Sequence, residues 1–398
     1  MKLSKSTLGD ISKDGRGYYG IAASAVPFSS CLYTYLRITD INDDGTLNAT
    51  DLKSVADDDA MHYLLKPNDI VFARTGASTG RNYFYDGTDG ELVYAGFLIK
   101  FSIDPQKVNP RFVKYYCQSK TYYDWIDSFN TGSTRGNINA QTLASMPIYL
   151  PKREYQDRVV SILDSIERKK RENSLINDNL QQQAMAIYHE RFETVSPNDL
   201  PSNWRIVTLG EVAAISNKSF NPLKEPEILL EHYSIPAFDE AKFPVFELST
   251  SIKSNKFIID ALCFMISKLN PTTKRVWKPY CLTGNAVCST EFIVYKAKDK
   301  SITNFLYSVI DSSSFSDFMC SHVTGSTGSR QRTTPSDTLS YELILPSEDE
   351  LAEFQSLVSP MYAQIRINAI ENDKLKRLRD SLLPKLMSGE IDVSAVQL

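Results

Sequence analysis

The chain has 398 residues, of which 42% are hydrophobic and 23% are charged, so it is long enough to form two or three domains with sizeable cores. Its net charge of −4 argues against a protein that holds DNA through bulk positive charge alone. Local basic loops or a basic partner can still supply a positive field, so DNA binding as such is not excluded.

Targeting and metal-binding signals are also missing from the sequence. No apolar run approaches the roughly 18–20 residues of a membrane span, and the first ten residues lack the apolar stretch of a signal peptide. The six cysteines form no CxxC pair, and with four histidines no zinc-site spacing is present. We therefore expect a soluble, cytoplasmic protein with reduced thiols and no metal.

In chain order, residues 1–150 read as a first sheet-rich α+β domain. Short β-like runs such as Asp69–Ala73 and Leu98–Phe101 are broken by Gly, Asn, Asp and Pro, and a helical stretch is predicted at Pro110–Trp125. Residues 151–195 then form a predicted spacer helix. They contain no Gly or Pro after Pro151, and apolar residues recur at the 3.5-residue spacing of a coiled coil.

The same plan repeats in the second half. Residues 196–346 read as a second sheet-rich domain with a helical stretch at Ile302–Met319, and residues 347–398 as a second spacer helix. Pro360 is expected to kink or break this helix near Ser359, and Gly389 to end it. Isolated helices this long are unstable in water, so we expect them to pack as an antiparallel pair that relates the halves by a pseudo-twofold axis.

Four motifs recur in order at offsets of 193 to 201 residues, which indicates an internal duplication. They are Thr7-Leu8-Gly9-Asp10 with Thr208-Leu209-Gly210-Glu211, Phe97-Leu98-Ile99 with Phe292-Ile293-Val294, Thr131-Gly132-Ser133-Thr134 with Thr324-Gly325-Ser326-Thr327, and Leu150-Pro151 with Leu345-Pro346.

The helix seams leave two questions open. Asn173, Asn368 and Asn372 lie on them and either set the register of the pair or face solvent or a partner. The apolar stripes are also wider than one partner helix needs, so they contact either the globular domains or another protein's helices. The partner-binding candidates are Val160, Leu163, Ile166, Leu378, Leu382 and Leu386.

Catalytic motifs are missing. There is no GxxxxGK[ST] loop and no HExxH, and none of the three Asn-Pro pairs continues as the NPPY-type loop of adenine methyltransferases. One GxGxxG match at Gly15, Gly17 and Gly20 does not follow a buried strand and does not open a helix. The sequence therefore predicts a protein that is not an enzyme.

The segments that lead into the helices carry a family resemblance. Met146–Pro151 with Arg153-Glu154-Tyr155-Gln156, and the terminal Leu382-Leu383-Pro384-Lys385-Leu386-Met387-Ser388-Gly389-Glu390-Ile391, resemble the central and distal regions of type I restriction–modification specificity subunits. The resemblance implies two target recognition domains, each reading half of a split, asymmetric site in double-stranded DNA. It also implies helices that set the spacing and bind two modification subunits, which methylate adenine. S-adenosylmethionine and ATP are then expected on partner subunits, including a restriction subunit that can join, and no cofactor is expected on this chain.

Base reading requires side chains that reach groove edges, and Gly-rich loops with Arg, Lys and hydroxyl groups offer them. In the first domain the candidates are Arg74, Thr75, Ser78, Arg81, Thr131, Ser133, Thr134, Arg135 and Asn137, with Lys13–Tyr19 as a weaker third region. In the second domain they are Lys268, Thr272, Lys274, Arg275, Thr324, Ser326, Thr327, Arg330 and Arg332. For each loop the alternative is a solvated surface turn. For the whole chain it is a coiled-coil protein-interaction scaffold that binds no nucleic acid, which the acidic charge balance favours and the duplicated loops disfavour.

Overall fold

The structure is a computed structural model that describes residues 3–129, 137–324 and 331–393. The chain divides into two compact units, each of which combines one globular domain with one end of each of two long helices. Unit 1 comprises residues 1–168 and 375–398, and unit 2 comprises residues 169–374.

The first domain is built around an antiparallel four-stranded sheet, in which β9 and β6 are the central strands. The order is β2 (Tyr18–Tyr19), β9 (Leu98–Ser102), β6 (Asp69–Ala73) and β7 (Asn82–Tyr85). Helices α1 (Pro110–Tyr116) and α2 (Lys120–Asp127) bury Phe112 and Tyr122 in one core with Phe72 and Phe101 of this sheet. The helical stretch expected at Pro110–Trp125 is therefore present, with a break between the two helices at residues 117–119.

A second sheet packs on the other side of β6. Its order is β3 (Ala25–Pro27), β5 (Lys53–Val55), β4 (Tyr33–Leu36) and β8 (Leu92–Tyr94), and β4 and β8 run parallel. Alternate side chains of a strand point to opposite faces, so β6 contributes Ile70 and Phe72 to the helix-covered core and Val71 to the core shared with the second sheet.

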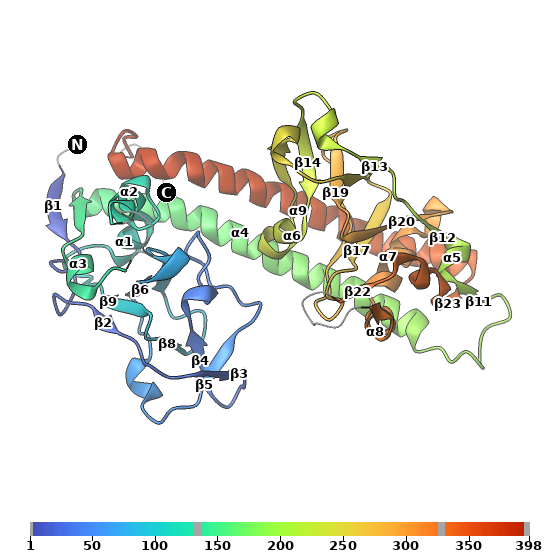
Figure 1. The fold of residues 1–398 in the computed structure, drawn as a ribbon, viewed down its shortest axis with the longest axis horizontal. Helices are drawn as coiled ribbons and strands as arrows, with labels where there is room; N and C mark the ends of the chain where they lie inside the picture. Colours follow the sequence, from blue (N-terminus) through green and yellow to red (C-terminus); the bar gives the residue numbers. More distant parts are fainter. Residues whose placement is uncertain (1–2, 130–136, 325–330, 394–398) are drawn as a thin grey trace. The chain divides into compact units, whose positions relative to one another are not determined.

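The second domain repeats the first sheet and alters the second. Its helix-covered sheet has the order β12 (Ala213–Ile215), β20 (Phe292–Ala297), β17 (Cys263–Ser267) and β18 (Val276–Trp277), with α7 (Thr303–Asp311) and α8 (Ser313–Ser321). The other sheet has five strands in the order β13 (Ser219–Phe220), β16 (Lys256–Ile258), β19 (Ala286–Ser289), β14 (Leu229–Tyr233) and β15 (Val245–Leu248). β14 and β19 are parallel like β4 and β8, but β16 adds a strand on the far side of β19. The sheets appear together in Figure 1.

Each domain is closed by a two-stranded ribbon that pairs its first strand with its last. β1 (Ser4–Thr7) pairs with β10 (Pro147–Leu150), and β11 (Arg205–Thr208) pairs with β23 (Glu342–Leu345). The Thr-Leu-Gly-Asp/Glu motif follows the first strand as a turn in which the Thr7 N–H donates to Asp10 and the Thr208 N–H to Glu211.

The leucine and the glycine of this motif are both required by packing. Leu8 and Leu209 are fully buried, and their N–H groups donate to Met146 and Tyr341 just before the closing strand. A Cβ on Gly9 would lie 2.9 Å from the Gly15 carbonyl oxygen and 3.2 Å from that of Ala144. The repeated motif is therefore the turn that begins each domain.

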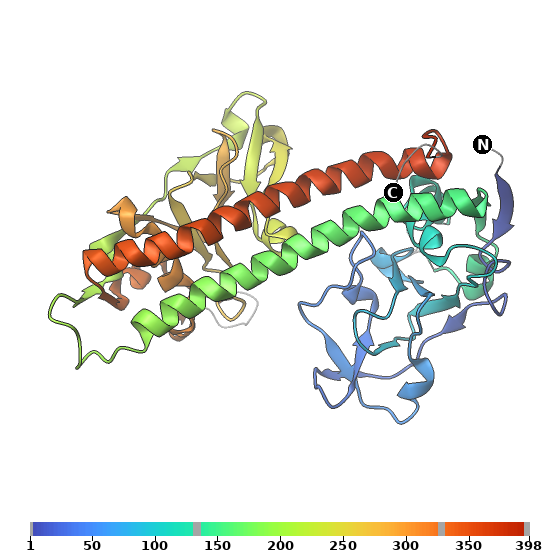
Figure 2. The same cartoon turned by 180° about the vertical axis from the view of Figure 1, so that it is seen from behind.

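The long helices are α4 (Arg153–Tyr188) and α9 (Glu348–Ser388), and they run side by side within each unit (Figure 2). In unit 1, Tyr155 bonds to Leu386 and Glu167 to Arg379, and in unit 2, Asn177 bonds to Asn368. Partner numbers fall along α9 as they rise along α4, so the pair is antiparallel, as predicted. α9 continues through Pro360 without the expected break and ends before Gly389, which has φ +76°. None of the described helices is long and apolar enough to cross a membrane.

Candidate nucleic-acid interface

Three chain segments of the first domain meet where β6 ends. The Arg74 N–H donates to the Phe97 carbonyl (3.1 Å), and the Ile138 N–H donates to the Arg74 carbonyl (2.9 Å). Thr75 and Asn137 form an isolated antiparallel bridge beside them. The strand junction, as we name this place, is thus fixed by backbone hydrogen bonds, and it brings the Arg74 loop next to the segment that follows Arg135.

The second domain contains the same strand junction where β17 ends. The Lys268 N–H donates to the Glu291 carbonyl (2.9 Å), and the Thr333 N–H donates to the Lys268 carbonyl (3.1 Å). Leu269 and Arg332 form the isolated bridge. Arg74 and Lys268 therefore correspond, and so do Asn137 and Arg332, which are two pairs among the predicted DNA-contact residues.

The strand register corrects one part of the sequence repeat. Ala73 pairs with Leu98 at the end of β6, and Ser267 pairs with Phe292 at the end of β17. Leu98 thus corresponds to Phe292, one residue away from the sequence match, which had aligned Phe97 with Phe292. Phe97 instead corresponds to Glu291. Both lie at the strand junction, and neither was predicted as a functional residue.

In the first domain the strand junction presents an arginine held between two aromatic rings. The Arg74 guanidinium carbon lies 5.2 Å from the centre of the Tyr19 ring and 5.7 Å from that of Phe97, and Nε donates to the Gly96 carbonyl (3.3 Å). Both rings are exposed, Tyr19 by 44% and Phe97 by 55%. The Tyr19 hydroxyl accepts a hydrogen bond from the Ala140 N–H (3.2 Å), which fixes the ring from its far end.

The rest of the Lys13–Tyr19 region is also basic and aromatic. The Arg16 guanidinium lies 5.0 Å from the centre of the Tyr18 ring, and its Nε donates to the Tyr18 hydroxyl (3.1 Å). This segment leads into Tyr19, so the third and weaker candidate region of the sequence analysis adjoins the strand junction.

In the second domain the strand junction carries an ion pair in place of the aromatic rings. Nε and Nη2 of Arg332 lie 3.0 and 3.3 Å from the two carboxylate oxygens of Glu291. The hydrogen bond to Glu291 raises the pKa of Arg332 above its usual value. Lys268 itself is half-buried. A carboxylate thus occupies the position that a phenylalanine occupies in the first domain, and it is neutralised by an arginine at the position of Asn137.

Three other predicted cations are paired with aspartates of their own domain. Arg81 contacts Asp43 (2.6 Å), Lys274 contacts Asp311 (2.9 Å), and Arg275 contacts Asp239 through two nitrogens (2.6 and 2.9 Å). A cation that already has a carboxylate partner gains less from a phosphate. These ion pairs could not be found from sequence, since each aspartate lies 36 to 38 residues away in the chain.

The predicted polar groups are distributed around these cations. Thr75 and Ser78 are half-buried, whereas Asn137, Thr272 and Thr324 are exposed, and the Thr324 hydroxyl donates to the Arg332 carbonyl (3.0 Å). The remaining candidates lie outside the described residues: Thr131, Ser133, Thr134, Arg135, Ser326, Thr327 and Arg330.

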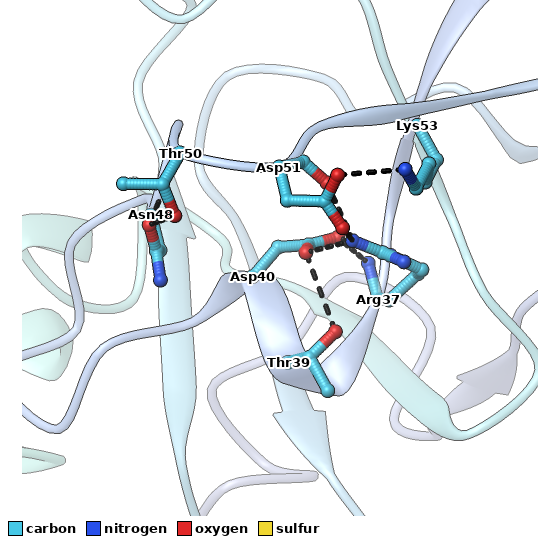
Figure 3. Close-up of polar contacts among 7 residues, drawn as sticks. All are labelled: Arg37, Thr39, Asp40, Asn48, Thr50, Asp51 and Lys53. Atoms are coloured by element: carbon cyan, nitrogen blue, oxygen red, sulfur yellow. Dashed lines mark hydrogen bonds and ion pairs between the residues drawn. The ribbon is translucent and has the colours of Figure 1, made fainter. Parts of the chain in front are cut away.

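In a second polar cluster of the first domain, at residues 37–53, the charged side chains pair with one another (Figure 3). Arg37 contacts Asp40 through Nε and Nη2 (2.9 and 2.7 Å), and Nη2 also donates to the Asp51 carbonyl (2.8 Å). Lys53 contacts the Asp51 carboxylate (2.6 Å). The buried Asp40 carboxylate also accepts from the Arg37 N–H, so these contacts organise the loop.

The six residues predicted to bind partner helices are mostly covered by unit 1 itself. Val160, Leu163, Ile166 and Leu386 are buried, and all but Ile166 belong to the core cluster that includes Phe112 and Tyr122 of the first domain. Leu382 is partly buried against the same cluster, and Leu378 is 47% exposed. The other exposed large apolar side chains on the described parts of the long helices lie in unit 2, namely Leu175, Ile176, Leu357 and Ile367.

The seam asparagines form hydrogen bonds between the two long helices. Asn173 is buried and donates to Glu371 (2.7 Å) and to Asn372 (3.0 Å), while Asn368 donates to Asn177 (2.8 Å). Asn372 donates in turn to the Lys170 carbonyl (3.2 Å). These contacts answer the question that the sequence left open: the amides face the partner helix rather than solvent, and their pairing is specific to one alignment of α4 with α9.

Side chains of the kinds that bind metals, and free thiols, occur in the described parts of both domains. Within residues 3–129, 137–324 and 331–393, no group of three or more His, Cys, Asp or Glu side chains is arranged to hold a metal ion. Burial raises the pKa of Cys117, Cys263 and Cys288, which disfavours the nucleophilic thiolate.

Comparison with known proteins gives a consistent result. Residues 20–182 match the family model described as the type I restriction modification DNA specificity domain. The type I restriction enzyme MjaIX specificity subunit of Methanocaldococcus jannaschii is 26% identical over 71% of this chain and 69% of its own. The HindI specificity subunit of Haemophilus influenzae is 23% identical over 82% of this chain and 87% of its own.

The fold has a solved counterpart. The crystal structure of a type I restriction–modification system S subunit from M. genitalium covers 97% of this chain and 96% of its own, with a TM-score of 0.57 and 14% identity. At that identity the match concerns the fold, which agrees with the predicted class of two sheet-rich α+β domains and two long helices. Together the matches do not favour the alternative of an interaction scaffold without nucleic-acid binding.

Proposed function

Because the chain belongs to the specificity subunits of type I restriction–modification systems, and so recognises a DNA sequence for such a complex without catalysing a reaction itself, we propose that each domain reads one half of a bipartite, asymmetric site. Residues 1–150 and 196–346 are the two target recognition domains in this proposal. Residues 151–195 and 347–398 are the spacer helices, and the complex acts on DNA in the cytoplasm.

The observation that carries this proposal is the duplicated strand junction. The same backbone hydrogen bonds occur in both domains, yet the side chains on them differ: Arg74 with Phe97 in one, Lys268 with Glu291 in the other. One scaffold with two different sets of base-contacting groups is what two different half-sites require. Asn137 and Arg332 add a base-reading or phosphate-contacting group at the corresponding place in each domain.

The spacing between the half-sites is assigned to α4 and α9. Two reading domains on one spacer recognise grooves only at a matching separation. The bonds of Asn173 and Asn368 support this role, because buried amides satisfied across two helices penalise any other alignment. Insertion of a few residues near Asn173 should therefore change the recognised spacer length, and an unchanged spacer would contradict this assignment.

Two modification subunits are the proposed protein partners, with a restriction subunit as a further one. In unit 2 the docking surface would include Leu175, Ile176 and Ile367. Asn177 bonds to Asn368, so Ile176 and Ile367 belong to the same turn of the helix pair. In unit 1 it would include Leu378 and Leu382. Exposed apolar side chains on otherwise polar helices are typical of interaction sites.

The experiment that tests the proposal is reconstitution of the chain with its cognate modification subunit, followed by mapping of methylated adenines on a randomised duplex library. We expect two fixed half-sites separated by a spacer of constant length. With a net charge of −4, the chain alone should bind DNA far more weakly than the complex, because the modification subunits add phosphate contacts. A contiguous site, or nanomolar specific binding by the chain alone at physiological salt, would contradict the proposal.

A further inference from the structure

The strand junction of the first domain contains one arginine whose orientation is fixed by groups other than a carboxylate. Tyr19 and Phe97 lie beside the Arg74 guanidinium, with ring centres 5.2 and 5.7 Å from its carbon, and Nε is bonded to the Gly96 carbonyl. Resting on the proposed function, we propose that Arg74 reads a guanine in the first half-site and that Tyr19 and Phe97 are the residues that position it.

The terminal nitrogens of Arg74 are its remaining hydrogen-bond donors. Nε is occupied by Gly96, and among the described residues the guanidinium has no other hydrogen-bond acceptor and no carboxylate partner. The two terminal nitrogens remain, and they present parallel N–H groups in one plane. Guanine offers the matching pair of acceptors, O6 and N7, at its major-groove edge.

The Arg74 guanidinium is oriented before DNA binds. A free arginine side chain has considerable rotamer entropy, part of which is lost when it is held in one geometry. Stacking on exposed aromatic rings holds the guanidinium plane before DNA arrives, so less of this entropy is lost on binding. The Tyr19 ring is itself held at its hydroxyl by the Ala140 N–H, and the backbone of Phe97 is fixed beside Arg74 by the bond between its carbonyl and the Arg74 N–H.

The surroundings of Arg74 distinguish base reading from phosphate binding. A phosphate contact needs a positive charge in polar surroundings, and Lys or a flexible Arg provides one. The tip of Arg74 is flanked by two apolar ring faces, which solvate a phosphate poorly but can lie against a thymine methyl group or the edge of a base pair. The surroundings of Arg74 therefore fit the groove floor better than the DNA backbone.

The second domain provides the contrast. Lys268 takes the place of Arg74, and Glu291 takes the place of Phe97 and forms a fork with Arg332. Continuing the pairing of Ile215 with Tyr295 places Asn217 where the first domain has Tyr19. The pair of aromatic rings beside the cation, Tyr19 and Phe97, is thus a property of the first domain. The guanine preference that these rings support should appear in the first half-site only.

The test uses the complete complex with its modification subunit and duplex libraries randomised one half-site at a time. Arg74→Gln should reduce discrimination at a single guanine of the first half-site by about 5- to 150-fold, the range expected for one bidentate contact. The slope of affinity against salt should barely change, and the second half-site should stay as it was. Uniform weakening across all sequences, with a shallower salt slope, would instead identify Arg74 as a phosphate contact and overturn the inference.

Variants of the rings separate positioning from packing. Phe97→Ala should relax the same guanine position, whereas Phe97→Tyr, which retains a ring, should restore it. Tyr19→Ala should act like Phe97→Ala. Lys268→Ala is the matched control in the second domain and should leave the first half-site unchanged. If Phe97→Ala leaves that position as selective as the parent chain, the rings do not position Arg74.

The outcome also distinguishes this inference from the proposed function. A parent complex that methylates no bipartite site contradicts the proposed function itself. A parent complex that methylates such a site, with the Arg74 variant equally selective at every position, contradicts the inference about Arg74 alone.

Discussion

In unit 1 an aspartate of α4 bonds to an arginine and a tyrosine of the first domain, whereas at the corresponding place in unit 2 a serine of α9 bonds to a neutral amide of the second domain. Asp164 of α4 lies 2.6 Å from Arg111 Nε and accepts a 2.6 Å bond from the Tyr115 hydroxyl. The offset of 195 residues between the helix entries places Ser359 of α9 at the position of Asp164, and Ser359 accepts a 3.1 Å bond from Asn304.

The same offset aligns Val159 with Phe354, and both are fully buried. Phe354 packs among Tyr188, Phe192 and Phe305, with ring centres 5.4 to 6.4 Å away. Val159 belongs to the core cluster of unit 1. Duplicated domains have therefore kept the place of contact with the helices while the chemistry of the contact has diverged, and the difference can be measured unit by unit.

The largest expected effect is from the aromatic cluster. Phe354→Ala should destabilise unit 2 by about 3–5 kcal/mol, because it removes a fully buried ring and leaves a cavity. Val159→Ala should destabilise unit 1 by about 2 kcal/mol, because fewer atoms are removed. Denaturant unfolding with hydrogen exchange read out separately in each unit measures both. Equal losses in the two units would show that the aromatic cluster contributes no more than the aliphatic core.

The second effect concerns the charged contact of unit 1. Asp164→Asn should destabilise unit 1 by about 2 kcal/mol, since a charged acceptor of the Tyr115 and Arg111 contacts is lost and partial exposure screens part of it. Ser359→Ala, at the corresponding position of unit 2, should cost about 1 kcal/mol or less. The same exchange measurement compares them, and a larger loss for Ser359→Ala would reverse the assignment of the stronger contact.

The third effect is a pH dependence specific to unit 2. Burial lowers the pKa of Lys278 to about 8 from its usual 10.5, and its ammonium group lies beside Tyr307, Tyr362 and Asn304. Below pH 8 the lysine is charged in both the folded and the unfolded state, so folding carries the full cost of burying the charge. As pH rises from about 8 to 10.5 the folded state is already neutral, and the cost disappears.

Lys278→Met should therefore stabilise unit 2 by about 1–2 kcal/mol at pH 7, and this gain should shrink between pH 8 and 10.5. Lys114 of unit 1 provides the comparison. Burial lowers its pKa too, but Glu167 and Asp164 oppose the shift, so Lys114→Met should give a smaller gain. Unfolding of each variant and its parent at matched pH values yields the difference, and a gain from Lys278→Met that is constant across this range would contradict the assignment.

The smallest effect is expected from the amide contacts of the helix pair. Asn173→Ala should destabilise unit 2 by about 1 kcal/mol, because the bonds to Glu371 and Asn372 are lost. Ser174→Ala removes the 3.2 Å contact with Asn372 and the 3.1 Å bond of the serine hydroxyl to the Lys170 carbonyl, both at an exposed position, and should have little effect. Hydrogen-exchange rates of the backbone N–H groups of α4 in unit 2 measure both effects. Identical rates in the two variants would show that the asparagine side chains do not contribute to helix alignment.

Much of the fold could be predicted because its signals are local or periodic. The heptad pattern located both long helices to within a few residues, and the recurrence of Thr-Leu-Gly with an acidic residue marked the start of each domain. Those features depend on residues near one another in the chain, namely a capping turn and an amphipathic stripe. The local rule that a proline breaks a helix failed at Pro360, since α9 continues through this residue.

The candidate site was predicted only in part. Arg74 and Lys268 were recognised as counterparts, but their neighbours Phe97 and Glu291 were missed, because the sequence match was one residue out of the strand register. Arg81, Lys274 and Arg275 looked like available cations until distant aspartates were found beside them. Val160 and Leu163 looked like partner contacts and are instead covered by the first domain. DNA contact and partner binding by the residues chosen from sequence stay predictions.

The sequence by itself determined the duplication and the long helices, because the hydrophobic period and the turn motifs can be read from short stretches of the chain. Only the tertiary structure decided which charges are already paired, which apolar faces are already covered and which side chain accompanies each strand junction. Those outcomes depend on contacts between segments tens of residues apart, and a shift of one residue in strand register exchanges a phenylalanine for a glutamate beside the predicted DNA-contact residues.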